Sequence, residues 1–170
     1  MITSHYTTNK IHSTSPEAFS LYEKSRLGEK KNNKIEYSLL EALYLISQNK
    51  MSLVANKKNL AEEEFIKKAR KADKRIEIKF PVYKDMRNKG YILKTALKFG
   101  ADFRVYKKGV KPGEDHSLWI LYAVKESESH SWYDFAAKNR VAHSTKKNLL
   151  IGIVDDEDDV TYYEIRWMKP

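Results

Sequence analysis

The sequence predicts a mixed fold of helices and strands, α/β or α+β, that is divided into two domains. Helical patterns prevail between residues 38 and 75, whereas the chain after Gly90 is dominated by segments rich in β-branched and aromatic residues. Pro81 and the change of pattern that follows it indicate a boundary between the two parts. We therefore expect an N-terminal α/β domain at residues 1–79 and a C-terminal domain at residues 80–170.

In the N-terminal domain, the first ~30 residues are rich in Ser, Thr and Lys, which predicts short edge strands or a loosely held arm. Ser38 and Glu41 have the spacing of a capping box and predict the start of a helix. Met51–Ala55 is typical of a short strand, and a second helix is predicted over residues 60–75. The inward face of the first helix is predicted to consist of Leu39, Leu40, Leu43 and Ile46.

The C-terminal domain is predicted to begin with a helix that has Pro81 near its start and takes in residues 83–87, before Asn88-Lys89-Gly90 ends it. One further helix is expected at about 132–140. The predicted strands are YILKTAL, ADFRVY, SLWILYAV, NLLIGIV and VTYYEIRW. NLLIGIV is apolar nearly throughout, which is typical of a strand buried on both faces.

The charge balance points to a polyanionic partner. The chain has 32 Lys and Arg residues against 23 Asp and Glu residues, a formal net charge of +9. RNA, DNA or an anionic membrane surface would suit such a chain, although a merely solvated surface is the simpler alternative. Because no apolar run approaches the ~20 residues of a membrane span, we expect no membrane and a cytoplasmic location. The absence of cysteine excludes disulfides and Cys-type zinc sites.

Phosphate-binding and nucleophile-elbow fingerprints are missing, because the sequence has no GxxxxGK[ST], GxGxxG or GxSxG. An acidic run lies between the last two predicted strands, so it is predicted to be a hairpin loop. In a basic protein such a run favours docking onto a positive surface over holding a lone Mg²⁺. Its members are Asp155, Asp156, Glu157, Asp158 and Asp159.

A basic loop between two predicted strands has Tyr106 at its entrance and His116 at its exit. The loop is either an ordinary connection or the place where two reacting groups face something negative. Carboxylates at Glu114 and Asp115 would keep the imidazole closer to its protonated form, which suits a general acid. Neighbouring cations such as Lys107 would lower the pKa of the Tyr106 phenol from about 10 and make it a better base.

These residue types fit a cleavage of RNA that needs no metal. RNA carries its own nucleophile, the 2′-OH beside the scissile phosphate. An enzyme then needs a base for that proton, an acid for the departing 5′-oxygen, and a fixed positive charge for the phosphoryl oxygens. Tyrosine, histidine and lysine can supply these functions, but their spacing does not prove that they converge.

Four sequence blocks resemble the archaeal tRNA-splicing endonuclease family: GYILKTALKFGADFRVYKKG, EDHSLWIL, RVAHSTKKNLLIGIVD and YYEIRWMKP. Family-like spacing holds from about Lys34 to the C-terminus. The resemblance implies a nuclease-like α/β C-terminal domain with a central mixed sheet. It also implies a catalytic set of Tyr106 as base, His116 as acid and Lys147 as transition-state stabiliser, with Lys146 as the alternative lysine. Expected products are a 2′,3′-cyclic phosphate and a 5′-hydroxyl, and no metal or other cofactor is expected.

The resemblance further implies that a bulge base is clamped by cation–π stacking. Arg140 matches the family's arginine, and Trp167 is the best match for the second clamp residue. A packed core position is the alternative for Trp167. His143, which residue chemistry alone leaves as a structural or a substrate-contacting histidine, joins Ser144 in the expected substrate-binding set.

Assembly is also implied by the resemblance. Family members cleave both strands of a bulge–helix–bulge in precursor tRNA, whereas this chain carries one catalytic set. We therefore expect a tetramer, either of identical chains or with a non-catalytic paralogue, in which the acidic run 155–159 docks into a basic cleft. Two rival hypotheses are a non-catalytic RNA-binding subunit of the same complex and a metal-dependent DNA nuclease that uses Asp102, Glu114 or the acidic run.

Overall fold

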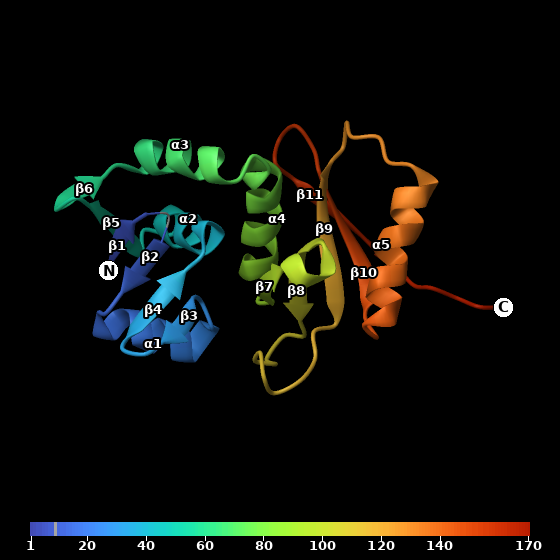
Figure 1. The fold of residues 1–170 in the computed structure, drawn as a ribbon, viewed down its shortest axis with the longest axis horizontal. Helices are drawn as coiled ribbons and strands as arrows, with labels where there is room; N and C mark the ends of the chain where they lie inside the picture. The colour runs from blue at the N-terminus through green and yellow to red at the C-terminus, as the bar shows by residue number, and fades with distance from the viewer. Residues whose placement is uncertain (9) are drawn as a thin grey trace. The chain divides into compact units, whose positions relative to one another are not determined.

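The computed structural model describes residues 1–8 and 10–170. The chain divides into two compact units, Met1–Phe80 and Pro81–Pro170. Each unit contains one sheet and packed helices (Figure 1). The predicted mixed fold of helices and strands is confirmed.

The N-terminal unit is built on a mixed sheet, which has six strands in the described residues, in the order β3-β4-β2-β1-β5-β6. The strands are β1 (Ile2–Thr7), β2 (Lys10–Ser13), β3 (Glu29–Lys31), β4 (Lys34–Tyr37), β5 (Met51–Ala55) and β6 (Lys58–Leu60). The expectation of edge strands or a loose arm is wrong for the start of the chain. β1 lies inside the sheet, antiparallel to β2 and parallel to β5. The alternation in ITSHYT explains this position, because Ile2 and Ser4 point into the core.

Three helices of this unit are α1 (Pro16–Ser25), α2 (Leu39–Ser47) and α3 (Glu62–Ala72). The sequence analysis missed α1, although Ser15 caps its first turn and Pro16 occupies a position that suits proline. The capping box of α2 is confirmed, since Ser38 and Glu41 bond each other's backbone N–H. The predicted apolar face of α2 is only partly right. Its buried residues are Glu41, Ala42, Leu43, Tyr44 and Leu45.

The helix α4 (Ile76–Asn88) corrects the expectation for Pro81, which lies inside the helix rather than near its start. Proline has no N–H to donate to the carbonyl four residues earlier, so a break was the natural expectation. The helix nevertheless starts before the proline, where the Arg75 N–H donates to the Asp73 carboxylate at 2.9 Å. It buries Val82, Tyr83 and Met86 and is followed by Gly90 at φ +89°.

The C-terminal unit is built on a five-stranded mixed sheet in the order β11-β10-β9-β8-β7. The strands are β7 (Ile92–Ala96), β8 (Ala101–Tyr106), β9 (Trp119–Lys125), β10 (Asn148–Val154) and β11 (Val160–Ile165). A 3₁₀ turn, η1 (Leu97–Phe99), joins β7 to β8. The helix α5 (Trp132–Ser144) joins β9 to β10, which run parallel, while the other neighbours are antiparallel.

The helices α4 and α5 cover opposite faces of this sheet (Figure 1). Under α5 lies a core cluster of Ala96, Ala101, Ile120, Tyr122, Ala142 and Leu149. On the other face, a Cβ added to Gly152 would lie 3.3 Å from both methyl groups of Val82. The glycine therefore lets α4 approach β10 closely. Within the part of the chain that the structure describes, no helix has the length and apolarity to cross a membrane.

Candidate active site

A cavity of about 450 Å³ lies in the C-terminal unit, at the end of β8. Side chains of all three predicted catalytic residues, Tyr106, His116 and Lys147, line it. They come from the end of a strand, the end of a loop and the segment after a helix, and only the fold brings them together. The other lining residues are Phe99, Arg104, Gly113, Glu114, Asp115 and Ser117.

Tyr106 is the last residue of β8 and is positioned by strand pairing. Its backbone pairs with Ile92 of β7, and it is 5% exposed. Residues two apart on a strand point to the same face, so Arg104 lies on the same side of the sheet as Tyr106. The phenol is thus placed by the sheet at one wall of the cavity.

His116 is presented by the loop between β8 and β9, and its side chain is exposed. The loop is shaped by its own carboxylates. Glu114 Oε2 accepts from the Lys111 N–H at 3.1 Å, and Asp115 Oδ1 accepts from the His116 N–H at 2.6 Å. The loop then rejoins the sheet where Leu118 N–H donates to the Val105 carbonyl at 2.8 Å. The predicted effect of these carboxylates on the imidazole stays a prediction.

Lys147 follows the C-terminus of α5, and the geometry of that end separates it from Lys146. Lys146 adopts a left-handed conformation, φ +56°, and both lysines donate backbone N–H groups to carbonyls of the last turn. This is the Schellman arrangement, which turns the chain sharply after a helix. Lys146 is exposed and does not line the cavity, whereas Lys147 does.

The ammonium group of Lys147 is partly buried and lies near the Arg104 charge. Its Nζ donates to the Thr145 carbonyl at 2.8 Å and lies 5.8 Å from the centre of the Phe99 ring. Burial, and secondarily the neighbouring Arg104 charge, lowers the pKa of Lys147 below its ordinary value. The group is therefore a cation whose charge is not balanced by a carboxylate bonded to it in the described residues.

Two polar lining residues, Arg104 and Ser117, were missed by the sequence analysis. Arg104 looked like any charged residue of a half-exposed strand, and the only signal was its even spacing from Tyr106. Ser117 was taken as part of a strand. It is 5% exposed, and its hydroxyl has no hydrogen-bond partner among the described residues.

The expected substrate-binding residues form a second group on α5 and beyond β11. Arg140, His143 and Ser144 are exposed, and α5 extends to Ser144 rather than to about residue 140 as predicted. Trp167 follows the end of β11 and is 50% exposed, so it is not a packed core residue. Its ring centroid lies 4.3 Å from that of His143. The Ser144 hydroxyl donates to the Val141 carbonyl at 3.0 Å.

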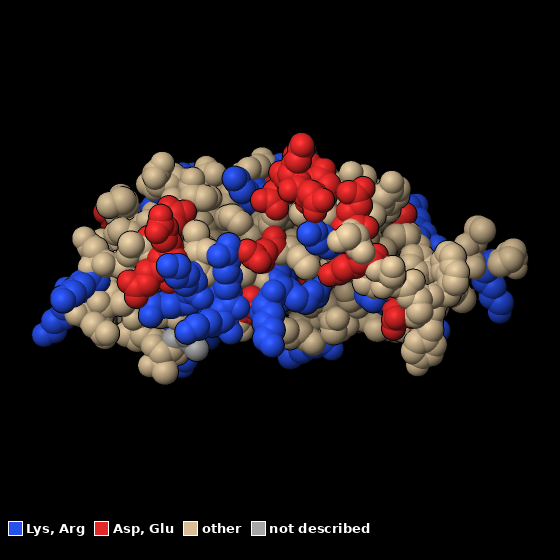
Figure 2. Space-filling model, turned by 90° about the horizontal axis from the view of Figure 1, so that it is seen from above, with Lys and Arg blue, Asp and Glu red and all other residues tan. Residues whose placement is uncertain are grey.

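The acidic run forms the hairpin loop between β10 and β11, as predicted. Asp155 shapes the loop, because its Oδ1 accepts from the N–H groups of Glu157 and Asp159 at 2.9 Å each. Asp156 pairs with Lys125 at 3.2 Å. Figure 2 shows acidic side chains gathered where this hairpin lies in Figure 1. Within residues 1–8 and 10–170, no group of three or more His, Asp or Glu side chains is arranged to hold a metal ion.

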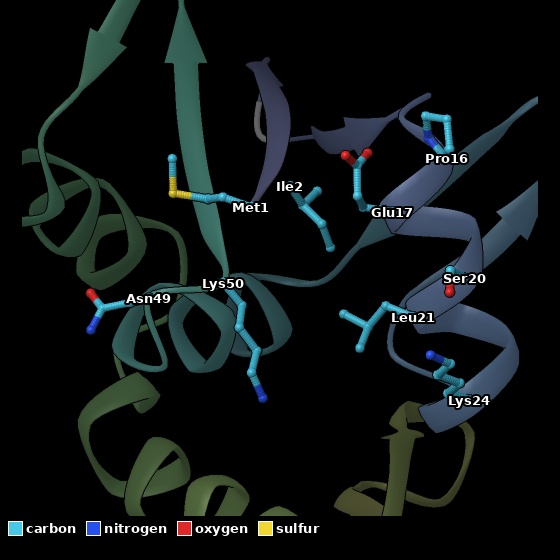
Figure 3. Close-up of a pocket in the computed structure, with 9 residues that line it drawn as sticks. All are labelled: Met1, Ile2, Pro16, Glu17, Ser20, Leu21, Lys24, Asn49 and Lys50. Carbon is cyan, nitrogen blue, oxygen red and sulfur yellow. The ribbon is translucent and has the colours of Figure 1, made fainter.

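A second cavity, of about 550 Å³, lies in the N-terminal unit between the start of β1, the helix α1 and the turn before β5 (Figure 3). Its charged lining residues are Glu17, Lys24 and Lys50, and its lining contains no tyrosine or histidine. The combination of a phenol, an imidazole and an ammonium group is a property of the C-terminal cavity.

Comparison with known proteins decides the family. Residues 76–162 match the model of the tRNA intron endonuclease catalytic C-terminal domain, and residues 5–66 match the model of the N-terminal domain. The chain belongs to the tRNA intron endonuclease family. All three cavity residues Tyr106, His116 and Lys147 fall within the matched catalytic domain, whereas Trp167 lies beyond it.

Curated members of the tRNA intron endonuclease family resemble the chain over most of its length. The tRNA-splicing endonuclease of Pyrococcus abyssi (strain GE5 / Orsay) is 41% identical over 162 residues, 95% of this chain and 93% of that protein. The tRNA-splicing endonuclease of Thermococcus kodakarensis (strain ATCC BAA-918 / JCM 12380 / KOD1) is 39% identical over 170 residues, 99% of each. That of Nanoarchaeum equitans (strain Kin4-M) is 48% identical over 141 residues, 79% of this chain and 90% of that protein.

Proposed function

We propose that the chain is the catalytic subunit of a tRNA-splicing endonuclease, which cleaves precursor tRNA at intron boundaries without a metal ion. Membership of the tRNA intron endonuclease family supports the activity in general. The observation that carries the catalytic role is the cavity in which Tyr106, His116 and Lys147 meet. A subunit that only binds RNA would not need these three groups in one place.

The proposed reaction is a transfer within the RNA backbone. Tyr106, as its phenolate, takes the proton of the 2′-OH, and the 2′-oxygen forms a bond to the adjacent phosphorus. The bond from phosphorus to the 5′-oxygen breaks, and His116 gives its proton to that oxygen. Lys147 stabilises the negative charge that grows on the phosphoryl oxygens. The products are a 2′,3′-cyclic phosphate and a 5′-hydroxyl.

The placement of the three groups suits these roles. Tyr106 is fixed by strand pairing, so its oxygen can be aimed at one position of a bound ribose. His116 stands on an exposed loop, where a leaving group can reach it from solvent. The ammonium of Lys147 is confined near Arg104, and an anionic phosphate would offset the repulsion between the two.

The exposed group on α5 supports a role in holding a bulge base. Arg140 lies one helical turn before His143, and the imidazole of His143 contacts the Trp167 indole. A guanidinium and an indole can each stack on a base of any identity, so the pair would recognise an extruded base without reading its sequence. We assign bulge–helix–bulge recognition to Arg140 and Trp167, with His143 and Ser144 beside them.

Two cuts in one precursor require two active sites, and the chain has one. We therefore propose a tetramer, of identical chains or with a non-catalytic paralogue. The hairpin at 155–159 supports this assembly, because it exposes Asp156, Glu157, Asp158 and Asp159 at the tip of a hydrogen-bonded turn in a protein with net charge +9. A negative tip of this kind fits a basic cleft on another subunit.

The test is cleavage of an intron-containing precursor tRNA by the purified chain, beside His116→Ala and the matched control His130→Ala. His130 is also exposed and pairs with Glu128 at 3.5 Å. We expect the wild type and the control to excise the intron and His116→Ala to lose about 10²- to 10⁴-fold in rate. Cleavage that appears only after a second polypeptide is added would identify a hetero-oligomer. A wild type that binds the RNA and never cleaves it, or cleavage by His116→Ala at the wild-type rate, would overturn the proposal.

A further inference from the structure

Arg104 shares the cavity with Tyr106, His116 and Lys147, and the roles proposed above leave it unused. It lies on β8 two residues before Tyr106, so strand geometry directs both side chains to the same face. Its Nε donates to the Thr95 carbonyl of β7 at 3.2 Å. This bond fixes the guanidinium at its inner nitrogen. The two terminal amino groups make no hydrogen bond or ion pair with the described residues.

The cavity therefore holds two cations side by side, and the Arg104 charge acts on the Lys147 ammonium. Two carboxylates, Glu114 and Asp115, also line the cavity, but neither forms an ion pair with Arg104 or Lys147 in the described residues. Glu114 accepts from the Lys111 N–H and Asp115 from the His116 N–H, both in the loop backbone. Two like charges in a confined site repel each other, and an anion bound between them would offset this repulsion. This arrangement prepares the site for a group that carries negative charge on more than one oxygen.

We propose that Arg104 is a second phosphate-binding group of this site and contacts a non-bridging oxygen of the scissile phosphate opposite Lys147. The inference rests on the function proposed above. A guanidinium presents paired N–H groups in a planar fork that matches two phosphate oxygens, whereas an ammonium acts as a point charge. Arg104 then orients the phosphate for in-line attack, and Lys147 stabilises the negative charge that grows on the phosphoryl oxygens in the transition state.

The competing explanation is structural, since the bond from Nε to the Thr95 carbonyl links β7 to β8. Two variants separate the explanations. Arg104→Gln removes the charge, and Arg104→Lys keeps the charge but loses the fork. The matched control is Lys98→Gln, which also removes one positive charge, from an exposed residue of η1 that does not line the cavity.

We expect Arg104→Gln to lower kcat/KM for precursor tRNA by about 10- to 100-fold, the range for losing charge-assisted hydrogen bonds. Arg104→Lys should recover part of that loss, and Lys98→Gln should stay within about twofold of wild type. The melting temperatures of all three should stay close to that of wild type. A second measurement without turnover is an NMR titration with inorganic phosphate, in which Arg104→Gln should weaken the shifts of cavity residues and Lys98→Gln should not.

The outcomes distinguish the inference from the function on which it rests. Wild-type cleavage with no loss in Arg104→Gln would overturn the role of Arg104 and leave the proposed function intact. Equal losses in Arg104→Gln and Arg104→Lys, together with a clear fall in melting temperature, would also overturn it and assign the residue to strand pairing. If the wild type does not cleave, the phosphate titration decides alone: weaker shifts in Arg104→Gln support the phosphate site, and unchanged shifts refute it.

Discussion

The Trp167 indole packs against the His143 imidazole in a tilted contact, with ring centroids 4.3 Å apart and ring planes inclined by 37°. The contact joins the segment after β11 to the last turn of α5. Arg140 precedes His143 by one helical turn. The contact with His143 therefore places Trp167 at the same end of α5 as Arg140, the other expected base-clamping residue. A tryptophan that is 50% exposed and already held by a neighbour can stack on a base with little loss of side-chain freedom.

Replacement of Trp167 by alanine should weaken RNA binding. Stacking of one base on an aromatic ring contributes about 1–3 kcal/mol, so we expect Kd for a bulge–helix–bulge RNA to rise about 5- to 150-fold. The control is Trp132→Ala, because Trp132 is 84% exposed at the other end of α5 and should leave Kd unchanged. Equal affinities of the two variants in a filter-binding or fluorescence assay would remove Trp167 from the binding site.

Replacing Lys146 should change stability but not cleavage, whereas replacing the adjacent Lys147 should change cleavage but not stability. Lys146 has φ +56°, a left-handed conformation that is strained for a residue with a Cβ but not for glycine. Lys146→Gly should therefore raise the free energy of unfolding by about 0.5–1 kcal/mol and leave cleavage intact. Lys147→Ala should abolish cleavage with little change in stability. Urea denaturation and a precursor-tRNA assay measure the two effects.

The control for Lys146→Gly is Lys138→Gly, the same replacement inside α5, which should destabilise the protein by about 1 kcal/mol. The assignment of the catalytic lysine would be wrong if cleavage were lost in Lys146→Gly and retained in Lys147→Ala.

Neutralising the tip of the β10–β11 hairpin should break the assembly. The variant should carry Asp156→Asn, Glu157→Gln, Asp158→Asn and Asp159→Asn, but retain Asp155, whose carboxylate holds two backbone N–H groups of the loop. Asn suits position 158, where φ is +64°. We expect sizing with light scattering to show dimers in place of tetramers, and cleavage at splice sites to be lost. Unchanged tetramers would refute the docking role of the loop.

The ionisation of Lys147 should depend on its neighbour. Burial and the Arg104 charge lower the pKa of Lys147, so the ammonium should lose its proton at a lower pH than an exposed lysine does. Since the unfolded chain then binds more protons than the folded one between the two pKa values, the free energy of unfolding should rise with pH across that interval.

NMR of proteins labelled at lysine Cε measures this titration. In Arg104→Gln the pKa of Lys147 should move up toward its ordinary value, and in Lys98→Gln it should stay in place. A Lys147 resonance that titrates identically in wild type and Arg104→Gln would show that the two charges do not interact.

The sequence predicted best what depends on local pattern. Alternation and β-branched content located the strands of the C-terminal sheet, and the Ser38–Glu41 spacing located a helix start. The element that it missed, α1, is short and follows a polar stretch in which its cap, Ser15, is one serine among many. The prediction for Pro81 was wrong, because proline usually lies at the start of a helix or breaks it. Here the helix continues through Pro81, and its second half is stabilised by the buried side chains of Val82, Tyr83 and Met86.

The candidate site divides in the same way. Tyr106, His116 and Lys147 were identified from motifs, and their meeting in one cavity needed the fold. Arg104 had no motif to mark it, since its significance comes from the side of β8 on which it lies. The contact between Trp167 and His143 joins residues that are 24 positions apart in the sequence, and no local pattern predicts such a contact.

The most direct measurement of the central claim is the chemistry of the cleaved ends. The purified enzyme is given a precursor tRNA with ordinary ribose at both splice sites, and a second one with a 2′-deoxy sugar at each scissile position, with and without EDTA. We predict 2′,3′-cyclic phosphate and 5′-hydroxyl ends from the first RNA, no effect of EDTA, and no cleavage of the second RNA. Cleavage of the 2′-deoxy substrate, or ends with a 5′-phosphate, would contradict attack by the ribose and with it the roles of Tyr106, His116 and Lys147.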